Sequence, residues 1–167
     1  VTGVQTCALP IFSDKSIKEM EGIVGKGTYF IFKDSTLLAK IGPADVFKAN
    51  YVGGLIRVVV NGSEKGRAKS IRVIQDKQED YLQLRLIQPV AKQRSYEGDF
   101  ELEIRKEAIN LINNLDLETY LEGVVESEGG PGQKVNLYKA QAVISRTYAM
   151  KYWNKHKENG YNLCDRV

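Results

Sequence analysis

The sequence predicts an α+β fold in which an antiparallel, β-rich part, arranged as a sheet or a small barrel, precedes two helices. Two observations support this prediction. From residue 12 to about residue 114, short segments that alternate apolar and polar residues follow one another with hairpin-type connections. From residue 115 onward, capping residues and glycines frame two segments of helical character. We therefore expect a β-rich part over residues 12–114 and a helical segment over residues 115–167.

Strands are expected where β-branched and aromatic residues concentrate or alternate with polar ones. The segments that meet this criterion are 28–32, 55–60, 70–74, 81–86, 99–105 and 108–112. The alternation is most regular in segment 99–105, which predicts that Phe100, Leu102 and Ile104 face inward. Segment 55–60 ends at Asn61-Gly62, a strong short-range signal for a hairpin turn.

The first helix is expected to begin after Asp116, whose side chain is a predicted N-cap, and to run from residue 117 to residue 125 or 126. Glu118 in its first turn favours a helix N-terminus. Pro131 and the glycines at 129, 130 and 132 are expected to stop this helix. Glu128 is therefore expected in the loop that follows.

The second helix is expected from residue 137 to about residue 157, with Asn136 as its N-cap. Its residues are apolar or small nearly all round, which predicts a buried helix. If a closing segment is missing after residue 167, the apolar face around Val143, Met150 and Trp153 is expected to be left partly exposed.

Both ends of the chain look unusual. Residues 1–11 resemble the translation of a common sequencing adapter, which predicts a metagenomic gene fragment with an artefact tail. This tail is expected to lie exposed or as an arbitrary strand, and to contact the core little. The alternative is a genuine N-terminal segment, such as the end of a signal peptide. Residues 162–167 stop shortly after a helix and a turn, which predicts an incomplete helical segment.

Composition excludes several classes of function. The net charge of +3 is too small to indicate nucleic-acid binding. A single histidine, His156, leaves no material for a multi-histidine metal site and makes a Ser-His-Asp triad improbable. Of the two cysteines, Cys7 lies in the suspected tail, so Cys164 has no predicted partner and no disulfide framework follows.

Three charged residues are candidates for chemistry. Glu128 lies at the junction of a helix and a glycine-rich loop, where a carboxylate could face a bulky polymer, or it is an ordinary solvated acid. Lys139 and Arg146 are seven residues apart and share one helix face. They either form a cationic wall for an anionic group or extend into solvent at the rim of the helix. Helix geometry leaves both alternatives open.

Three motifs resemble the SpoIID/LytB family of stage II sporulation protein D and amidase-enhancer proteins. The motifs are Gly123-Val124-Val125-Glu126-Ser127-Glu128, the run Lys139-Ala140-Gln141-Ala142-Val143-Ile144-Ser145-Arg146-Thr147-Tyr148-Ala149, and Gly160-Tyr161-Asn162-Leu163-Cys164-Asp165. Spacing from Glu128 to Lys139 and Arg146 matches the family without a gap. The resemblance is specific over about residues 96–165. Glu126 and Gly129 depart from the family, which usually has Pro and Met at these positions.

The resemblance implies a peptidoglycan lytic transglycosylase, which cleaves the bond between N-acetylmuramic acid and N-acetylglucosamine with a single glutamate as acid and then base. It implies that Glu128 is the catalytic acid and that Lys139 and Arg146 are active-site residues that bind substrate. Glycan strands would be the main partner, and the protein would act outside the cytoplasm, in the cell envelope or after secretion. The alternative of another class is a non-catalytic peptidoglycan-binding enhancer of a cell-wall amidase. A weaker third alternative is a β-rich interaction scaffold.

The resemblance also concerns zinc. Cys164 matches the first ligand of a zinc site whose other ligands would follow Val167, so zinc is expected in a full-length parent protein and not in this chain. The present chain is therefore expected to be inactive by itself and to bind zinc poorly. His156, eight residues before Cys164, is interpreted as a solvated residue at a helix end.

Overall fold

The computed structural model describes residues 6–156, 158 and 161–163. The chain divides into two compact units. One, here called the β unit, comprises Pro10–Asn113, and the other, the helical unit, comprises Val1–Leu9 and Asn114–Val167. No helix among the described residues is long and apolar enough to cross a membrane.

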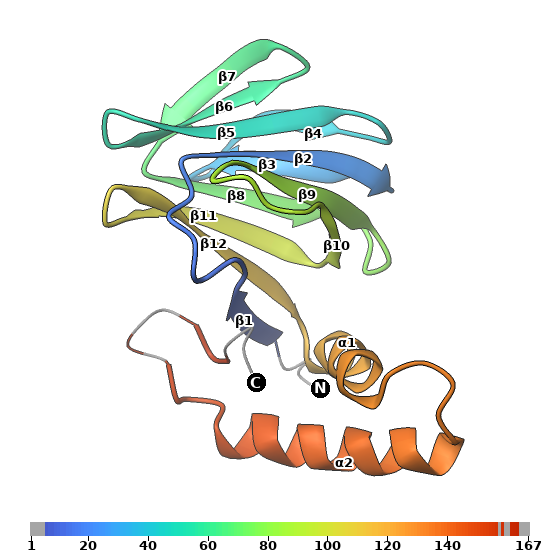
Figure 1. Ribbon diagram of the computed structural model, residues 1–167. Helices are drawn as coiled ribbons and strands as arrows, with labels where there is room; N and C mark the ends of the chain where they lie inside the picture. Colours follow the sequence, from blue (N-terminus) through green and yellow to red (C-terminus); the bar gives the residue numbers. More distant parts are fainter. Residues whose placement is uncertain (1–5, 157, 159–160, 164–167) are drawn as a thin grey trace. The chain divides into compact units, whose positions relative to one another are not determined.

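Two six-stranded sheets account for about half of the chain, and the strand pairs are antiparallel (Figure 1). The first sheet has the order β1 (Thr6–Pro10), β12 (Ala108–Asp116), β11 (Asp99–Arg105), β8 (Ser70–Gln75), β3 (Tyr29–Lys33) and β4 (Thr36–Ile41). The second has the order β10 (Arg94–Glu97), β9 (Tyr81–Gln88), β2 (Glu19–Lys26), β5 (Val46–Val52), β6 (Leu55–Val60) and β7 (Ser63–Ala68). The helices are α1 (Leu117–Gly129) and α2 (Val135–Lys151). The predicted α+β class is confirmed.

One continuous apolar core fills the β unit. Alternate residues of strands such as β6, β8, β9 and β11 contribute to it, as period-two patterns predict. Ile56, Val58 and Val60 of β6 are buried, and so are Phe100 and Leu102 of β11, whereas Ile104 is only partly buried. Because successive side chains of a strand point to opposite faces, a regular alternation in the sequence identifies these strands and their inward faces.

The Asn61-Gly62 turn forms as predicted. Asn61 has φ 47° and Gly62 has φ 82°, so both residues occupy the left-handed region that a tight hairpin of this type requires. The turn joins β6 to β7 with Val60 opposite Ser63. Strand β7 itself, Ser63–Ala68, was not expected, because this edge strand is mostly polar and exposed and shows no apolar alternation.

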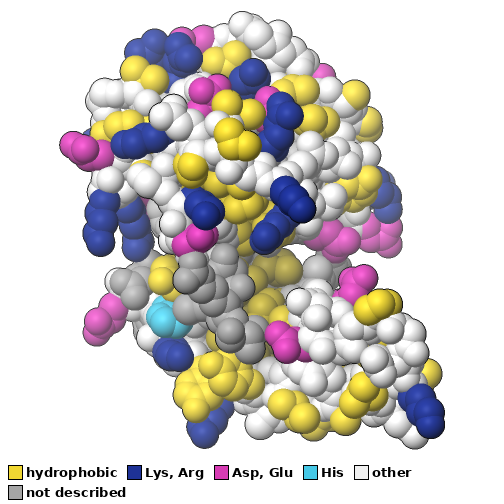
Figure 2. Space-filling view, in the orientation of Figure 1, with side chains coloured by type: hydrophobic (Ala, Val, Ile, Leu, Met, Phe, Trp, Pro, Cys, Tyr) yellow, Lys and Arg dark blue, Asp and Glu magenta, His cyan; other side chains and the backbone are white. Residues whose placement is uncertain are grey.

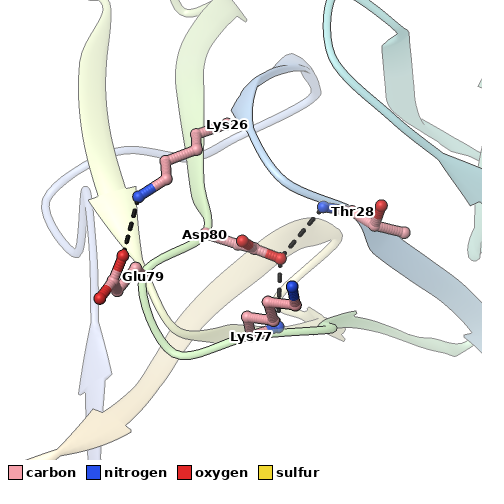
Figure 3. Close-up of polar contacts among 5 residues, drawn as sticks. All are labelled: Lys26, Thr28, Lys77, Glu79 and Asp80. Carbon is pink, nitrogen blue, oxygen red and sulfur yellow. Dashed lines mark hydrogen bonds and ion pairs between the residues drawn. The ribbon is translucent and has the colours of Figure 1, made fainter.

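A buried carboxylate fixes one end of the β unit (Figure 3). Asp80 is 3% exposed, and its Oδ2 accepts hydrogen bonds from the backbone N–H groups of Thr28 at 3.0 Å and Lys77 at 3.1 Å. Gly27 has φ 80°, and a Cβ there would lie 1.9 Å from the Asp80 carboxyl group, so this turn requires glycine. Outside it, Lys26 and Glu79 form an ion pair at 2.9 Å. Asp80 therefore has a structural role.

Helix α1 begins as predicted and ends later than predicted. The Asp116 carboxylate accepts hydrogen bonds from the backbone N–H and the hydroxyl of Thr119, at 2.9 and 2.8 Å, so its N-cap role is confirmed. The helix continues to Gly129, and Gly130, with φ 66°, is the C-cap. Glu128 thus lies in the last turn of the helix, and its expected place in the loop is wrong.

Helix α2 differs from the prediction at both ends and in its burial. It begins after Lys134 rather than Asn136, and it ends at Lys151 rather than near residue 157. Only Ser145 and Ala149 are buried within it, so the prediction of a buried helix is wrong. The face of α2 that carries Ser145 and Ala149 packs inside the helical unit, and the other faces of α2 are exposed to solvent. The exposed large apolar side chains are Val135, Leu137, Val143, Ile144, Tyr148 and Met150, and Figure 2 shows apolar side chains on the surface of this unit.

Residues 6–10 form a strand, one of the two expected arrangements, but the burial of this segment is contrary to expectation. Cys7 and Leu9 are buried in the core of the helical unit, and Ile11 is buried in the core of the β unit. The backbone N–H of Ala8 donates to Asn162 Oδ1 at 3.1 Å, and the N–H of Asn162 donates to the carbonyl of Ala8 at 2.9 Å. Cys7 and Leu9 alternate with Ala8 in β1, so the strand buries both on one face. Residues 1–5 lie outside the described residues.

Candidate functional site

Two concave surfaces lie on the helical unit, and each takes residues from both helices. The first, here called the Glu128 pocket, has a volume of about 170 Å³. The side chains around it are Tyr120, Val124, Glu128, Gln141, Ile144, Ser145, Tyr148, Tyr152, Lys155, His156 and Leu163. Apolar walls with a few polar groups are typical of pockets that bind small or extended ligands.

Helical periodicity explains which side chains meet in the Glu128 pocket. Tyr120, Val124 and Glu128 are spaced by four residues, so they lie in one row along α1. Gln141, Ser145 and Tyr148 follow the same spacing rule along α2. Extension of α1 to Gly129 completes the first row, because it brings Glu128 onto the face that carries Tyr120.

Tyrosines form one wall of the pocket. The ring centroids of Tyr148 and Tyr152 are 4.6 Å apart, and the rings are tilted by 48°. The ammonium groups of Lys151 and Lys155 lie 5.3 and 5.5 Å from the centroid of the Tyr152 ring, within range of a cation–π interaction. Tyr148 itself is 49% exposed. The pocket therefore presents an aromatic surface to solvent beside an exposed carboxylate.

The polar side of the pocket comes from α2 and the segment after it. Gln141 Nε2 donates a hydrogen bond to the buried Ser145 hydroxyl at 3.2 Å. His156 packs its ring against Tyr161, with centroids 5.3 Å apart. Among the described lining residues, Glu128 is the only carboxylate. The site thus offers one acid, amide and hydroxyl groups, and aromatic rings.

The second surface, here called the Lys139 groove, contains the two predicted cations. Its volume is about 800 Å³. Its lining residues are Glu118, Leu121, Glu122, Val125, Glu126, Gly130, Pro131, Val135, Tyr138, Lys139, Ala142 and Arg146. The Arg146 guanidinium donates to the carboxylate of Glu118, so part of the positive charge is already paired. Three glutamates face two cations across this groove.

Glu128 does not meet Lys139 and Arg146 on one concave surface, so the expectation that these residues converge is wrong. The two surfaces share no lining residue. In an α-helix, residues two positions apart point roughly 200° apart around the axis. Lys139 precedes Gln141 by two residues, and Arg146 precedes Tyr148 by two. The cations therefore share one face, as predicted, but that face is not the one that lines the Glu128 pocket.

The loop between the helices is held by Tyr138. Its hydroxyl donates to the carbonyl of Gly130 at 2.6 Å and accepts from the N–H of Gln133 at 3.1 Å. A Cβ at Gly129 would lie 2.9 Å from a carbon of the Tyr138 ring, closer than real Cβ atoms approach. The glycine at 129 thus allows this ring to pack against the end of α1.

The described residues contain no cluster of three or more His, Cys, Asp or Glu side chains that could hold a metal ion. Cys164, the expected first zinc ligand, lies outside the described residues. Cys7 is fully buried, and its burial, together with the nearby Asp116, raises the pKa of its thiol to about 12. A thiol with such a pKa is a poor nucleophile and a poor metal ligand.

Sequence reasoning missed most residues of the Glu128 pocket. Tyr120 precedes Glu128 by eight residues, which is two helical repeats of four, but the row is visible only if the helix is known to include residue 128. Gln141, Ser145 and Tyr148 stand inside the recognised motif and share one helix face. The spacing of these three residues could therefore have predicted that they line a common site on α2.

Comparison with known families extends over the helical part of the chain. Residues 105–167 match the family model described as SpoIID, Stage II sporulation protein. This segment includes the end of β11, β12 and both helices, and therefore all residues that line the two concave surfaces. Comparisons with curated proteins and with solved structures give no match. Residues 105–167 of this chain are thus similar to the SpoIID family of stage II sporulation proteins, a family related to sporulation and the cell wall.

Proposed function

We propose that this protein contributes to a peptidoglycan lytic transglycosylase activity in which Glu128 acts on the bond between N-acetylmuramic acid and N-acetylglucosamine. The observation that carries the proposal is the place of Glu128. It belongs to the segment that matches the SpoIID family, and its exposed side chain lines a pocket with three tyrosines. Its substrate would be the glycan strand, and the protein would act outside the cytoplasm.

A single carboxyl group suffices for this reaction. The protonated Glu128 donates its proton to the glycosidic oxygen as the bond from that oxygen to C1 breaks. The resulting carboxylate then takes the proton of the sugar's own 6-hydroxyl, whose oxygen bonds to C1 and closes a 1,6-anhydro ring. Water is not consumed, and Glu128 returns to its starting state. Ordinary glycoside hydrolases use a pair of carboxylates, whereas the described lining of this pocket supplies one.

Lys139 and Arg146 have no part in bond cleavage in this proposal, because they line the separate Lys139 groove. The substrate-binding role that the family resemblance implies for them stays a prediction. A role close to the cleaved bond would require a different arrangement of the two helix faces.

The test compares two variants of the complete gene product on purified sacculi. Glu128→Gln should lower the release of 1,6-anhydro-muropeptides about 10²–10⁴-fold, the usual effect of losing a general acid. Glu126→Gln is the matched control, because Glu126 is an exposed acid two residues away that faces the other groove. It should leave the rate unchanged.

Two results would contradict the proposal. Full activity of Glu128→Gln would exclude the residue as the acid, and equal losses in both variants would indicate a general effect on α1. If the wild-type protein binds sacculi, releases no anhydro product and stimulates a cell-wall amidase, the non-catalytic alternative is correct.

A further inference from the structure

We propose that the outer face of the second sheet contains a binding site for a small zwitterion of amino-acid type, which is a free amino acid or the end of a short peptide. The site lies in the β unit and goes beyond the proposed function, because it involves neither Glu128 nor the two helices. Arg57 binds the carboxylate of the ligand, and Glu19 binds its ammonium group. Asn50, which lies between them, binds a polar group of the ligand backbone.

These three side chains form one line across adjacent strands, here called the Arg57 row. Glu19 of β2 lies opposite Asn50 of β5, and Asn50 lies opposite Arg57 of β6. Residues directly opposite each other in an antiparallel sheet project from the same face. Neighbouring strands are about 4.8 Å apart, so the backbones that carry Glu19 and Arg57 are separated by about 10 Å. The row therefore presents a carboxylate, an amide and a guanidinium in order along one face.

No side chain of the Arg57 row forms a hydrogen bond or an ion pair within the part of the chain that the structure describes. All three side chains are half-buried, and the Nε of Arg57 is a buried donor without an acceptor. Such a donor lowers stability, because it has lost water and gained no partner. A guanidinium that turns toward a ligand carboxylate gains its acceptors, and its fork of N–H groups fits the two carboxylate oxygens.

Neighbouring charges on the same face are already paired. Glu21 of β2 forms an ion pair with Arg85 of β9. Arg67 of β7 lies directly opposite Arg57, and its Nε donates to Glu64 at 2.9 Å. The guanidinium of Arg67 is thus neutralised within the sheet, whereas that of Arg57 is not. This contrast between adjacent strands makes the Arg57 row the part of the face that is open to a ligand.

A groove surrounds the Arg57 row. Its volume of about 420 Å³ lies within the range of about 300–1,000 Å³ that is usual for ligand sites. Val46 and Val59 line it and can contact a small apolar side chain, and Lys48 adds a second cation. Because Glu19 lines the same groove, a polyanion would meet a like charge there. A zwitterion avoids this repulsion, since it matches the cations at one end and the carboxylate at the other.

The experiment records two-dimensional proton–nitrogen NMR spectra of this 167-residue chain while probes are added. Alanine and alanyl-alanine are the zwitterions, and the tighter of the two distinguishes a free amino acid from a peptide end. N-acetyl-alanyl-alanine lacks the ammonium group, alanyl-alaninamide lacks the carboxylate, and inorganic phosphate is a plain anion. At least one zwitterion should shift the amide resonances of β2, β5 and β6. The other three probes should bind about 10–100-fold more weakly, the usual effect of losing one hydrogen bond to a charged group.

Variants of the two charged residues assign the two ends of the ligand. Arg57→Gln should weaken zwitterion binding about 10–100-fold, and Glu19→Gln should remove the preference for alanyl-alanine over N-acetyl-alanyl-alanine. Arg67→Gln is the matched control, because Arg67 lies opposite Arg57 but does not line the groove, and it should bind like the wild type. The same spectra show whether each variant is folded. Arg57→Lys retains the charge without the fork, so it serves as the second variant at this position and should show a smaller loss.

The inference is overturned if neither zwitterion shifts the resonances of β2, β5 and β6, or if Arg57→Gln and Arg67→Gln bind equally well. It is also overturned if inorganic phosphate and N-acetyl-alanyl-alanine bind as tightly as alanyl-alanine, because the groove would then be a plain anion site. None of these measurements involves glycan cleavage. Failure of this site is therefore distinguishable from failure of the proposed function, which is measured on sacculi through Glu128.

Discussion

Replacement of Gly129 by alanine should change the stability of the helical unit in a direction that depends on Tyr138. Gly129 is the last residue of α1, and a Cβ there would lie 2.9 and 3.0 Å from two carbons of the Tyr138 ring. The ring cannot move away freely, because its hydroxyl bonds to Gly130 at 2.6 Å and to Gln133 at 3.1 Å. The substitution thus forces a choice between the clash and the two hydrogen bonds.

The expected magnitude follows from two opposing effects. Alanine is a better helix former than glycine by up to about 1 kcal/mol. Displacement of the Tyr138 ring loses two hydrogen bonds, each with a net value of about 1 kcal/mol. Gly129→Ala should therefore lower the free energy of unfolding by about 1 kcal/mol. In a Tyr138→Ala background only the difference in helix propensity remains. Gly129→Ala should then raise the free energy of unfolding by up to about 1 kcal/mol.

The assay is urea unfolding followed by tryptophan fluorescence. Trp153 is the only tryptophan of the chain, and it packs against the apolar core of the helical unit, so the signal reports on that unit. Gly123→Ala is the matched control. Gly123 lies in the same helix, and a Cβ there would have no heavy atom within 4 Å, so this variant should be more stable in both backgrounds. If Gly129→Ala stabilises the wild type as much as Gly123→Ala does, the reasoning about Tyr138 is refuted.

Three further predictions concern the same unit. Asp116→Ala should lower the free energy of unfolding by about 1 kcal/mol, because it removes the N-cap of α1. Asp116→Asn should retain most of the wild-type stability, and urea unfolding followed by tryptophan fluorescence measures both variants. Arg146→Ala should change stability by less than about 1 kcal/mol, because its ion pair with Glu118 is solvent-exposed, and a larger loss would show that the pair matters more than its exposure indicates. The third prediction uses a Cys164→Ser variant, in which Cys7 is the remaining cysteine. Burial raises the pKa of the Cys7 thiol to about 12, so this thiol should resist thiol reagents at pH 8 until the protein is unfolded. The pKa of this thiol in the unfolded chain is near 9.0, so the contribution of Cys7 to the free energy of unfolding is complete below about pH 9. This contribution should be lost as the pH rises toward 12. A free energy of unfolding that stays constant over that pH range would contradict the burial of Cys7.

The fold was predictable where apolar and polar residues alternate regularly along a strand. Strand β11 alternates apolar and polar residues along its length, and its inward face follows directly from that pattern. Strand β7 was not predictable, because an edge strand with polar residues on both faces carries no alternation. Its existence depends on the hydrogen bonds that β6 offers and on the turn at Asn61-Gly62.

The candidate site was predictable only in part, for a reason that lies in one backbone angle. The sequence contains glycines at 129 and 130, and either can end a helix. The structure places the left-handed φ at Gly130, so the helix takes in Glu128 and turns its side chain toward Tyr120. Local propensity does not distinguish two adjacent glycines, whereas in the structure the Tyr138 ring packs against Gly129 and its hydroxyl bonds to Gly130.

The hydrogen bonding between Ala8 and Asn162 has a consequence for biosynthesis. The two residues are 154 positions apart, whereas the whole β unit lies between them in the sequence. At about 5–20 residues per second, a ribosome needs roughly 8–30 s to synthesise the stretch from one to the other. During this interval the β unit can fold, while Cys7 and Leu9 still lack the partners that bury them. Strand β1, which emerges before the β unit, is thus covered only after it, which makes β1 a natural point of contact for a chaperone and of misassembly between nascent chains.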